Sequence, residues 1–376
     1  MSDFPKGLEG VTAAETQSSF IDGQNGILEY VGIRIGDLTK HSNFEESVFL
    51  LWNHRLPTKA ELEKFTKELR ADYALPQGVL DMIQTLPKDT APMHALRTLV
   101  SSLSMYDAEP NSVEIEDVRH KSLKILGQTP TIIAAFDRYR RGLDIVAPDP
   151  SLGFSENFLY MLNGEKPTET MVKAFDICMI LHADHGLNNS TFTARVIIST
   201  LSDIYSAITG AIGSLRGPLH GGANEGVMVM LGEIPTVDDA EPFILDKIKR
   251  KDKIMGFGHR VYKTKDPRAE DLQTLAEQLA KDTGNEDLYA KSHKIEQVME
   301  RELGAKGIYP NVDFYSATTY HCIGLKLDLF TPMFAMSRVA GWAAHVLEQL
   351  DGNRLFRPGA AYTGPHDVAY TPIDQR

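Results

Sequence analysis

Cysteine is scarce in this sequence, which has only Cys178 and Cys322 among its 376 residues. Two cysteines are too few for a disulfide framework or for a metal site built on thiolates. No apolar run is long enough to span a bilayer, and the start MSDFPKGLEG lacks the charged-then-apolar layout of a secretory signal. These absences predict a cytoplasmic protein without a membrane segment.

Positive charge is also in deficit. The chain has 39 Lys and Arg against 51 Asp and Glu, a net charge of −12. Because no long basic run compensates for this excess, a nucleic-acid-binding protein is disfavoured. An anionic small substrate would be repelled at long range and would need a local cluster of Arg or Lys to bind. The charge balance therefore points the search to a basic pocket in an acidic protein.

Helical periodicity dominates what is present, so the predicted fold class is mainly α. Residues 44–69 hold two amphipathic stretches, the second opened by Pro57-Thr58, and residues 167–186 are apolar at helical spacing up to Gly186. Residues 191–217 contain no proline and predict one long helix. Only residues 26–38 alternate in the way that predicts a small N-terminal β hairpin.

Composition also predicts how the chain divides into domains. The segment 233–310 is more charged and is interrupted by prolines, whereas the chain becomes apolar again after Phe314. We expect a large helical domain of residues 1–220 and 319–376, with a small domain of residues 221–318 inserted into it.

Histidine, arginine and aspartate gather near glycine or proline in five stretches. They are HADHGLNN (182–189), GPLHGGANE (217–225), GFGHRVYKTKDPR (256–268), NVDFYS (311–316) and SRVAGWAAHVLEQLDGNRLFRP (337–358). Each alone fits an ordinary turn or a solvated helix face. Five of them in a chain with 12 histidines indicate a catalytic site.

HADH raises the alternative of a metal-dependent lyase or hydrolase, with His182, Asp184 and His185 as ligands. In a helix, however, the first and last of these share a face and the aspartate lies off it. No HExxH pattern supports zinc. The sequence therefore predicts no metal site.

GFGHRVYK resembles a phosphate-cradling loop, but it lacks GxxxxGK[ST] and the third glycine of GxGxxG, so nucleotide hydrolysis is disfavoured. What the stretch offers is backbone freedom at Gly256 and Gly258, then His259 among basic residues. Arg268 follows Pro267, which restricts the backbone there. Together these features suggest a reagent histidine beside an anion clamp.

Two further residues have both a catalytic and a structural interpretation. His220, between Gly-Pro and Gly-Gly, is either a satisfied turn residue or a reagent at the start of a helix. Asp313 lies among apolar neighbours, which would raise its pKa and make it a stronger base. Locally, a helix cap or an Asx turn explains Asp313 as well.

Taken together and in this order, GPLHGGANE, MGFGHRVYKTKDPR, PNVDFYS and SRVAGWAAHVLEQ…NRLFRP resemble the citrate synthase family in its short form, which includes 2-methylcitrate synthases. The resemblance covers nearly the whole chain, from GLEGV to RPGAAYTGP. It implies a two-domain helical fold, a homodimer and closure of the small domain over the site. Asp184 stands where the commoner family motif, HAEH, has glutamate. We expect this change to be harmless because the charge is kept.

The resemblance also assigns roles to residues. The catalytic residues would be His220, His259 and Asp313. Oxaloacetate would be bound by His185, Arg268, Arg338 and Arg357, the last contributed in trans by the partner subunit. Coenzyme A would contact Ile254, Met255, Gly256, Phe257, Gly258, Arg260 and Lys263. No cofactor is implied, because the coenzyme A thioester is a substrate.

The implied reaction joins acetyl-CoA to oxaloacetate and hydrolyses citryl-CoA to citrate and CoA. Asp313 would remove the methyl proton while His220, kept neutral by the helix that follows it, donates to the enolate oxygen. His259 would act as acid on the ketone. The alternatives are a 2-methylcitrate synthase that uses propionyl-CoA and a non-catalytic helical scaffold; one methyl group is worth only about 1–3 kcal/mol in a pocket.

Overall fold

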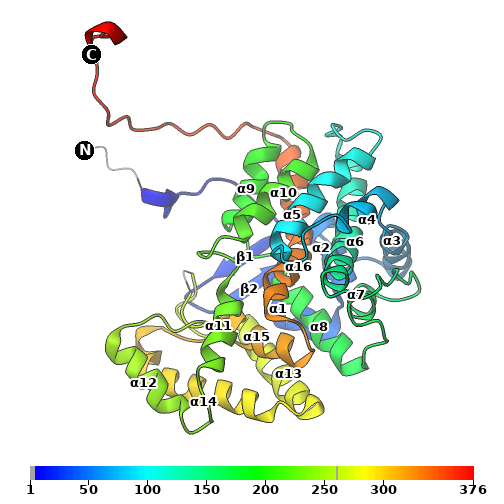
Figure 1. The fold of residues 1–376 in the computed structure, drawn as a ribbon, viewed down its shortest axis with the longest axis vertical. Coiled ribbons are helices and arrows are strands. Elements are labelled where there is room, and N and C mark those ends of the chain that lie inside the picture. Colours follow the sequence, from blue (N-terminus) through cyan, green and yellow to red (C-terminus); the bar gives the residue numbers. More distant parts are fainter. Residues whose placement is uncertain (1–4, 260) are drawn as a thin grey trace.

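The computed structural model describes residues 5–259 and 261–376, and within them the chain is built mainly of helices (Figure 1). The α-helices are α1 (Ile35–His41), α2 (Phe44–Asn53), α3 (Lys59–Ala71), α4 (Gln77–Ile83), α5 (Pro92–Ser102), α6 (Ile115–Arg140), α7 (Phe154–Asn163), α8 (Glu169–His182), α9 (Asn189–Ile198), α10 (Ile204–Leu215), α11 (Ala223–Gly232), α12 (Ala240–Arg250), α13 (Pro267–Thr283), α14 (Glu286–Leu303), α15 (Val312–Cys322) and α16 (Phe330–Leu350). The strands are β1 (Ser19–Asp22), β2 (Ile27–Tyr30) and β3 (Ile33–Arg34). Short 3-10 turns are η1 (Lys6–Leu8), η2 (Leu103–Tyr106), η3 (Gly304–Lys306), η4 (Leu327–Leu329) and η5 (Ile373–Gln375). The mainly α fold predicted from the sequence is confirmed.

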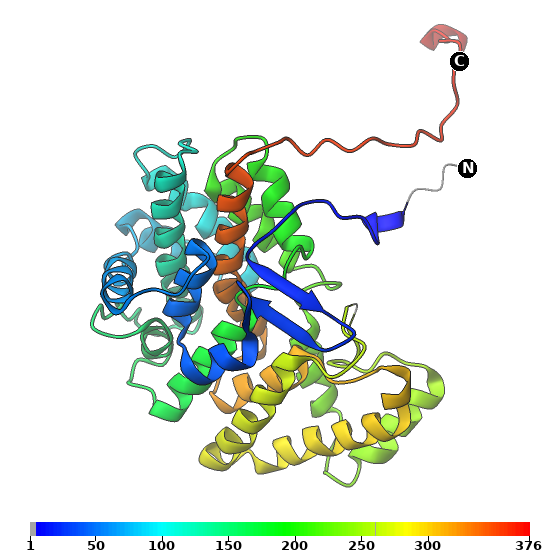
Figure 2. The same cartoon turned by 180° about the vertical axis from the view of Figure 1, so that it is seen from behind.

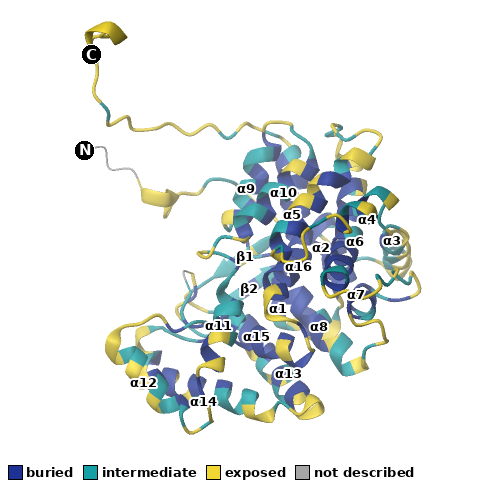
Figure 3. Cartoon of the chain, viewed as in Figure 1, coloured by how far each residue is buried: buried dark blue, intermediate teal, exposed yellow. Residues whose placement is uncertain are grey.

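Helix α16 lies at the centre of the larger group of helices (Figures 1 and 2). It packs against α2, α6, α8, α9 and α10, and every residue in it except Glu348 and Leu350 is buried. A helix that is apolar on all sides can be stable only inside such a bundle. The same dark core is visible in Figure 3, where exposed residues lie mostly on the outer helices and the terminal arms.

Helices α11 to α15 form a second group beside the first. α12 packs on α14, and α15 packs on α11, α13 and α14 (Figure 1). Helix α15 also contacts α8 of the larger group, so the two groups meet along it. The expected boundary at 220/221 precedes α11, and the one at 318/319 falls within α15.

The expected hairpin at 26–38 is only partly correct. The strands form an antiparallel sheet in the order β1-β2-β3, with Ser19 opposite Tyr30 and Glu29 opposite Arg34. Strand β1 was not expected, and residues from Ile35 onward form α1 instead of strand. Ile35 and Leu38 are both buried, and their i, i+3 spacing places them on one face of that helix.

The single helix predicted for 191–217 is wrong, because the chain breaks there into α9 and α10. Asp203 caps α10 by accepting a hydrogen bond from the Ser206 amide at 2.8 Å. Ser199 Oγ donates back to the Val196 carbonyl at 2.7 Å, and Leu201 has a φ of +61°. Two side chains that compete for backbone groups thus end one helix and begin the next.

The helix predicted to end at Gly186 ends at His182 instead. Its last carbonyls accept hydrogen bonds from α16: Ser337 Oγ donates to Met179, and Arg338 Nε donates to His182 at 2.7 Å. Because these orphan carbonyls already have partners, the helix needs no glycine cap. By contrast, the two helices predicted within 44–69 are confirmed as α2 and α3, the second opened by a capping box between Thr58 and Glu61.

Both termini extend away from the helices. After α16 the chain runs as a long, mostly exposed arm (Figures 1 and 3). Within the described ranges, no helix has both the length and the apolar character needed to cross a membrane.

Candidate active site

His185 lies in the turn that follows α8. Its Nε2 is 3.1 Å from the Tyr262 hydroxyl, and its ring meets the ring of His259 edge-on, with centroids 5.3 Å apart. Two stretches separated by more than 70 residues in sequence are thereby joined. Burial, and then the charge of Arg268, hold the pKa of His185 well below its ordinary value, so the ring is neutral.

The neighbouring Asp184 secures this turn. It is fully buried and accepts hydrogen bonds from Ser19 Oγ at 2.6 Å and from the Gly186 amide at 3.1 Å. Its other oxygen lies 3.3 Å from Nε2 of His345. Burial raises the pKa of Asp184, but His345 and Arg338 outweigh it and leave the pKa lowered. The carboxylate is therefore occupied by protein groups.

The residues of HADH do not share one site. His182 is fully buried, and its Nδ1 lies 2.8 Å from the Cys178 carbonyl, whereas His185 faces Tyr262. Among the described residues, no group of three or more His, Cys, Asp or Glu side chains could hold a metal ion.

The loop that carries His259 depends on two glycines in the left-handed region, Gly256 (φ +79°) and Gly258 (φ +77°). A Cβ on Gly256 would lie 2.7 Å from a methyl of Val227 and 2.8 Å from the Phe314 ring, so no side chain fits there. The expectation of backbone freedom at these positions is confirmed.

The tautomer of His259 follows from its hydrogen bonds. Its Nδ1 accepts from the backbone amides of Val261 at 3.0 Å and Tyr262 at 3.1 Å. Since Nδ1 is an acceptor, the neutral ring carries its hydrogen on Nε2. Burial, followed by the charge of Arg268, lowers the pKa of His259 to about 4. The ring is therefore a neutral donor through Nε2.

Asp313 lies in the first turn of α15, and Asn311 is the N-cap of that helix. Asn311 also ties the helix to the glycine loop: its Nδ2 donates to the Gly258 carbonyl and its amide to the Gly256 carbonyl, both at 2.9 Å. The residue that caps α15 is therefore Asn311 and not Asp313. Asp313 keeps some exposure, yet burial raises its pKa to about 6 against the opposing charge of Arg268.

Two arginines complete a positive field around these groups. Arg268 is 3% exposed and is held by Asp266 through Nε at 2.9 Å and Nη2 at 2.7 Å. Arg338 is 1% exposed, donates through Nε to the His182 carbonyl, and stacks over Phe334 at 4.7 Å. Their charges act on His185 and Asp313 alike, and they are the kind of local positive charge that an anionic substrate of this acidic chain would need.

His220 approaches the same region from the start of α11. Its Nε2 lies 2.8 Å from Ser190 Oγ, which in turn accepts a hydrogen bond from Trp342 Nε1 at 3.1 Å. Burial, reinforced by the charge of Arg338, lowers the pKa of His220 to about 4. The ring is neutral as expected, but burial and a nearby cation are the causes, and not the helix that follows His220.

The coenzyme A contacts expected at residues 254–258 form a tightly packed loop. Ile254 and Phe257 are 7% and 9% exposed, and Phe257 bridges to Pro310. Lys263 is exposed, and its amide donates to the Gly23 carbonyl at 2.8 Å, so the turn between β1 and β2 supports this loop. Arg260 lies outside the described residues.

Arg357 is not brought to the other site residues within this chain. It lies exposed in the arm after α16, where its Nη1 donates to the Pro358 carbonyl at 3.0 Å. The structure also adds groups that sequence reasoning missed, above all Tyr262, Ser190 and Asp266. Tyr262 and Asp266 stand inside the stretch GFGHRVYKTKDPR, whereas nothing local to Ser190 signals its role.

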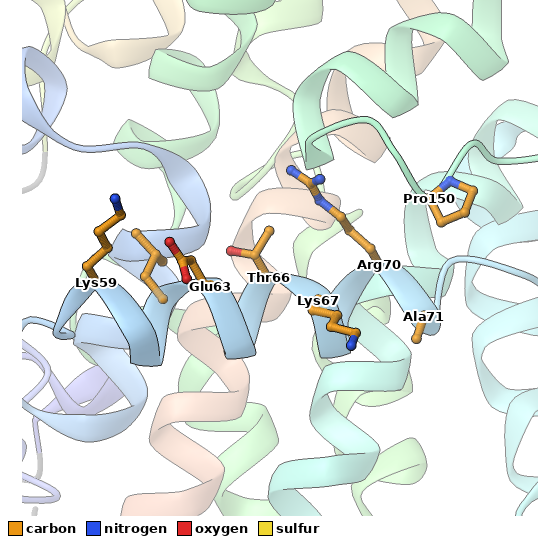
Figure 4. Close-up of a pocket in the computed structure, with 8 residues that line it drawn as sticks. Lys59, Glu63, Thr66, Lys67, Arg70, Ala71 and Pro150 are labelled. Carbon is orange, nitrogen blue, oxygen red and sulfur yellow. The ribbon is translucent and has the colours of Figure 1, made fainter.

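A surface groove lies elsewhere, along α3. Figure 4 shows it, a cavity of about 640 Å³ along α3 that contains none of the expected site residues. Apart from Pro150, its lining comes from that one helix. This groove is therefore separate from the candidate active site.

Comparison with known proteins agrees with this geometry. Residues 7–359 match the family described as "Citrate synthase, C-terminal domain". The chain is 50% identical to citrate synthase 2 of Bacillus subtilis over 99% of both chains, and 40% identical to 2-methylcitrate synthase 2 of Corynebacterium glutamicum over 100% of this chain and 98% of that one. Its fold matches a citrate synthase from Thermoplasma acidophilum with a TM-score of 0.93 at 35% identity, covering 99% of each chain. That structure is described as a ternary complex with carboxymethyl coenzyme A and oxaloacetate.

The family match and these relatives cover nearly the full chain. This chain is therefore an enzyme of the citrate synthase family.

Proposed function

We propose that this enzyme condenses acetyl-CoA with oxaloacetate and hydrolyses the resulting citryl-CoA to citrate and CoA. The observation that carries the proposal is Asp313, a carboxyl with a pKa of about 6, in the same charged environment as two neutral histidines and two buried arginines. The names of the relatives support this choice of substrates.

Oxaloacetate would bind first, between Arg268 and Arg338. Nη1 of Arg268 and both Nη atoms of Arg338 have no acceptor among the described residues, so they are available to a dianion. A forked guanidinium suits bidentate pairing with a carboxylate. His185, neutral and aligned by Tyr262, would donate a hydrogen bond to the substrate, and Arg357 would come from a second copy of this chain.

Asp313 would then take a proton from the methyl group of acetyl-CoA. A carboxylate with a pKa of about 6 is ionised at pH 7 and is a stronger base than a solvated one. His220 would stabilise the enolate oxygen through Nδ1–H. This tautomer requires Nε2 to accept, and the Ser190 amide at 3.4 Å donates to it. The Ser190 hydroxyl lies 2.8 Å from both Nε2 and Asn188 Oδ1, and its one hydrogen can be donated to either acceptor.

His259 would donate its Nε2 hydrogen to the ketone oxygen of oxaloacetate while the enolate carbon forms the new carbon–carbon bond. Its Nδ1 is engaged by two backbone amides, so the ring cannot turn without losing both hydrogen bonds. The product, citryl-CoA, then loses CoA to water. Each general acid or base supplies about 10²–10⁴-fold, and positioning must supply much of the rest.

Coenzyme A would lie along residues 254–258, contacting backbone more than side chains because Ile254 and Phe257 point into the core. Exposed Lys263 is suited to a phosphate, and we assign the same role to Arg260 from the sequence. The thioester is itself a substrate, so no further cofactor is proposed.

We also propose a cytoplasmic homodimer in which residues 221–318 close over residues 1–220 and 319–376 after oxaloacetate binds. Closure would exclude water until the carbon–carbon bond has formed. Small-angle scattering should show compaction at saturating oxaloacetate, and an unchanged radius of gyration would contradict this part of the proposal.

Thiol release from acetyl-CoA and from propionyl-CoA, each with and without oxaloacetate, tests the reaction. Release that requires oxaloacetate and is faster with acetyl-CoA supports the proposal. A preference for propionyl-CoA would favour 2-methylcitrate synthesis, the alternative suggested by the relative from Corynebacterium glutamicum. No release from folded protein with either thioester would overturn the catalytic proposal.

A further inference from the structure

A second cavity, away from the candidate active site, is lined by charged residues alone. Its volume is about 510 Å³, and its lining residues are Lys88, Arg140, Arg141, Lys326 and Asp328. They come from three separate parts of the chain: the loop between α4 and α5, the C-terminal end of α6, and the link between α15 and α16. We call this cavity the basic pocket.

The two carboxylates near the basic pocket form ion pairs only with its arginines, although Asp328 also lies in the field of Lys326. Buried Asp137 pairs with Arg140 at 2.7 Å and with Arg141 at 3.1 Å, and Asp328 pairs with Arg140 through Nη2 at 2.8 Å. In the part of the chain that the structure describes, Lys88 makes no ion pair and lies over the Tyr139 ring at 5.2 Å. Lys326 likewise has no ion-pair partner there. Two positive charges therefore remain uncompensated.

Helix electrostatics explain only part of this cluster. Cations are favoured at the C-terminal end of a helix, which accounts for Arg140 and Arg141. Lys88 and Lys326 belong to other segments, and their convergence on two arginines is repulsive. In a chain with a net charge of −12, a local excess of this kind favours a bound anion.

We propose that the basic pocket binds a small oligophosphate. A ligand with two anionic groups can pair with both uncompensated lysines, which come from different segments of the chain. Arginine forks and lysine point charges are the usual partners of phosphate oxygens. The link that carries Lys326 and Asp328 joins α15, which holds Asp313, to α16, which holds Arg338.

Calorimetric titration of the full-length protein with diphosphate tests this proposal. The titration is run without and with saturating oxaloacetate and CoA, which fill the candidate active site. We expect one diphosphate per chain, with binding that weakens as salt is raised. The double variant Lys88→Ala/Lys326→Ala should bind about tenfold more weakly or worse, since two charged contacts are lost.

The matched control removes two lysines from the groove of Figure 4, as Lys59→Ala/Lys67→Ala. These lysines are also exposed and the change in net charge is identical, so general attraction falls equally in both variants. Lys88→Gln/Lys326→Gln provides a second test variant that keeps longer side chains. Unchanged thermal midpoints would establish that all the variants are folded.

Three outcomes would overturn the proposal. Absence of binding to the wild-type protein, or equal weakening in the test and control variants, would mean that no specific site exists. Diphosphate binding that disappears when oxaloacetate and CoA are added would place the anion in the active site. If tricarballylate binds more tightly than diphosphate, and this binding is lost in the test variants, the site is specific for polycarboxylates and not for phosphates.

Discussion

The Tyr262 hydroxyl lies 3.1 Å from Nε2 of His185, while the Tyr262 backbone amide donates to Nδ1 of His259 at 3.1 Å. One residue thus orients two histidines that belong to different parts of the chain. Both rings contact the Tyr262 ring as well, with centroids 5.6 Å and 4.7 Å away.

Tyr262→Phe should therefore weaken oxaloacetate binding without unfolding the protein. The side-chain hydrogen bond is lost but the backbone contact to His259 remains, so we expect kcat/KM for oxaloacetate to fall roughly threefold to tenfold, mainly through KM. Steady-state kinetics with varied oxaloacetate measure this change. Tyr139→Phe removes a hydroxyl that donates to the Gln84 carbonyl at 2.7 Å and should leave KM unchanged. Equal effects from both variants would rule out a positioning role.

The activity should depend on pH through Asp313. Burial raises the pKa of this proposed base to about 6. Because a base must be ionised to accept a proton, kcat/KM should be constant near pH 7–8. It should be halved near pH 6 and fall about tenfold per pH unit below that. His220 and His259, with pKa values of about 4, stay neutral over this range. A pH–rate profile that rises as the pH falls through 6 would contradict the assignment of Asp313.

Asp176 should make the stability of the fold depend on pH. Burial, and then the nearby Glu45, raise its pKa from 3.8 to about 7, so the folded state favours the protonated form. Its stabilising contribution is complete below about pH 4 and is lost as the pH rises through 7. As the pH rises from 5 to 8, we expect the urea midpoint of the wild-type protein to decrease relative to the midpoint of Asp176→Asn. A constant difference between the two proteins would show that Asp176 does not titrate in this range.

Gly256→Ala should reduce both stability and activity. The substitution combines a φ of +79° with contacts of 2.7 Å to Val227 and 2.8 Å to Phe314. Gly352→Ala is the matched control, because its φ is +81° and nothing lies within 4 Å. The control should lose about 1–2 kcal/mol in free energy of unfolding from backbone strain alone. Gly256→Ala should lose at least about 1 kcal/mol more from overpacking. Equal losses in urea titrations would mean that the loop can move aside.

Residues His220, His259 and Arg268 could be singled out from the sequence, because glycines and prolines restrict or free the backbone around them within short stretches. The side chains that contact these residues from distant parts of the chain could not be predicted from the sequence. Ser190 and Trp342 support His220 from positions far away in the chain, and nothing in their local sequence indicates this contact.

Helix positions that depend on local sequence were predicted correctly, whereas helix ends that depend on distant contacts or on an unusual backbone conformation were not. Periodicity and the Thr58 cap predicted α2 and α3 correctly. The break between α9 and α10 depends on a positive φ at Leu201, which this residue type does not signal. The early end of α8 depends on donors from α16 that lie more than 150 residues away.

The burial of α16 has a consequence for how this enzyme can change. Arg338 reaches the site directly, Trp342 holds the partner of His220, and His345 holds the aspartate beside His185. A substitution that alters the volume of this helix therefore moves groups of the candidate site as well as core atoms. Thermal adaptation and substrate preference would have to evolve together along α16, whereas the exposed outer helices are free to vary for stability alone.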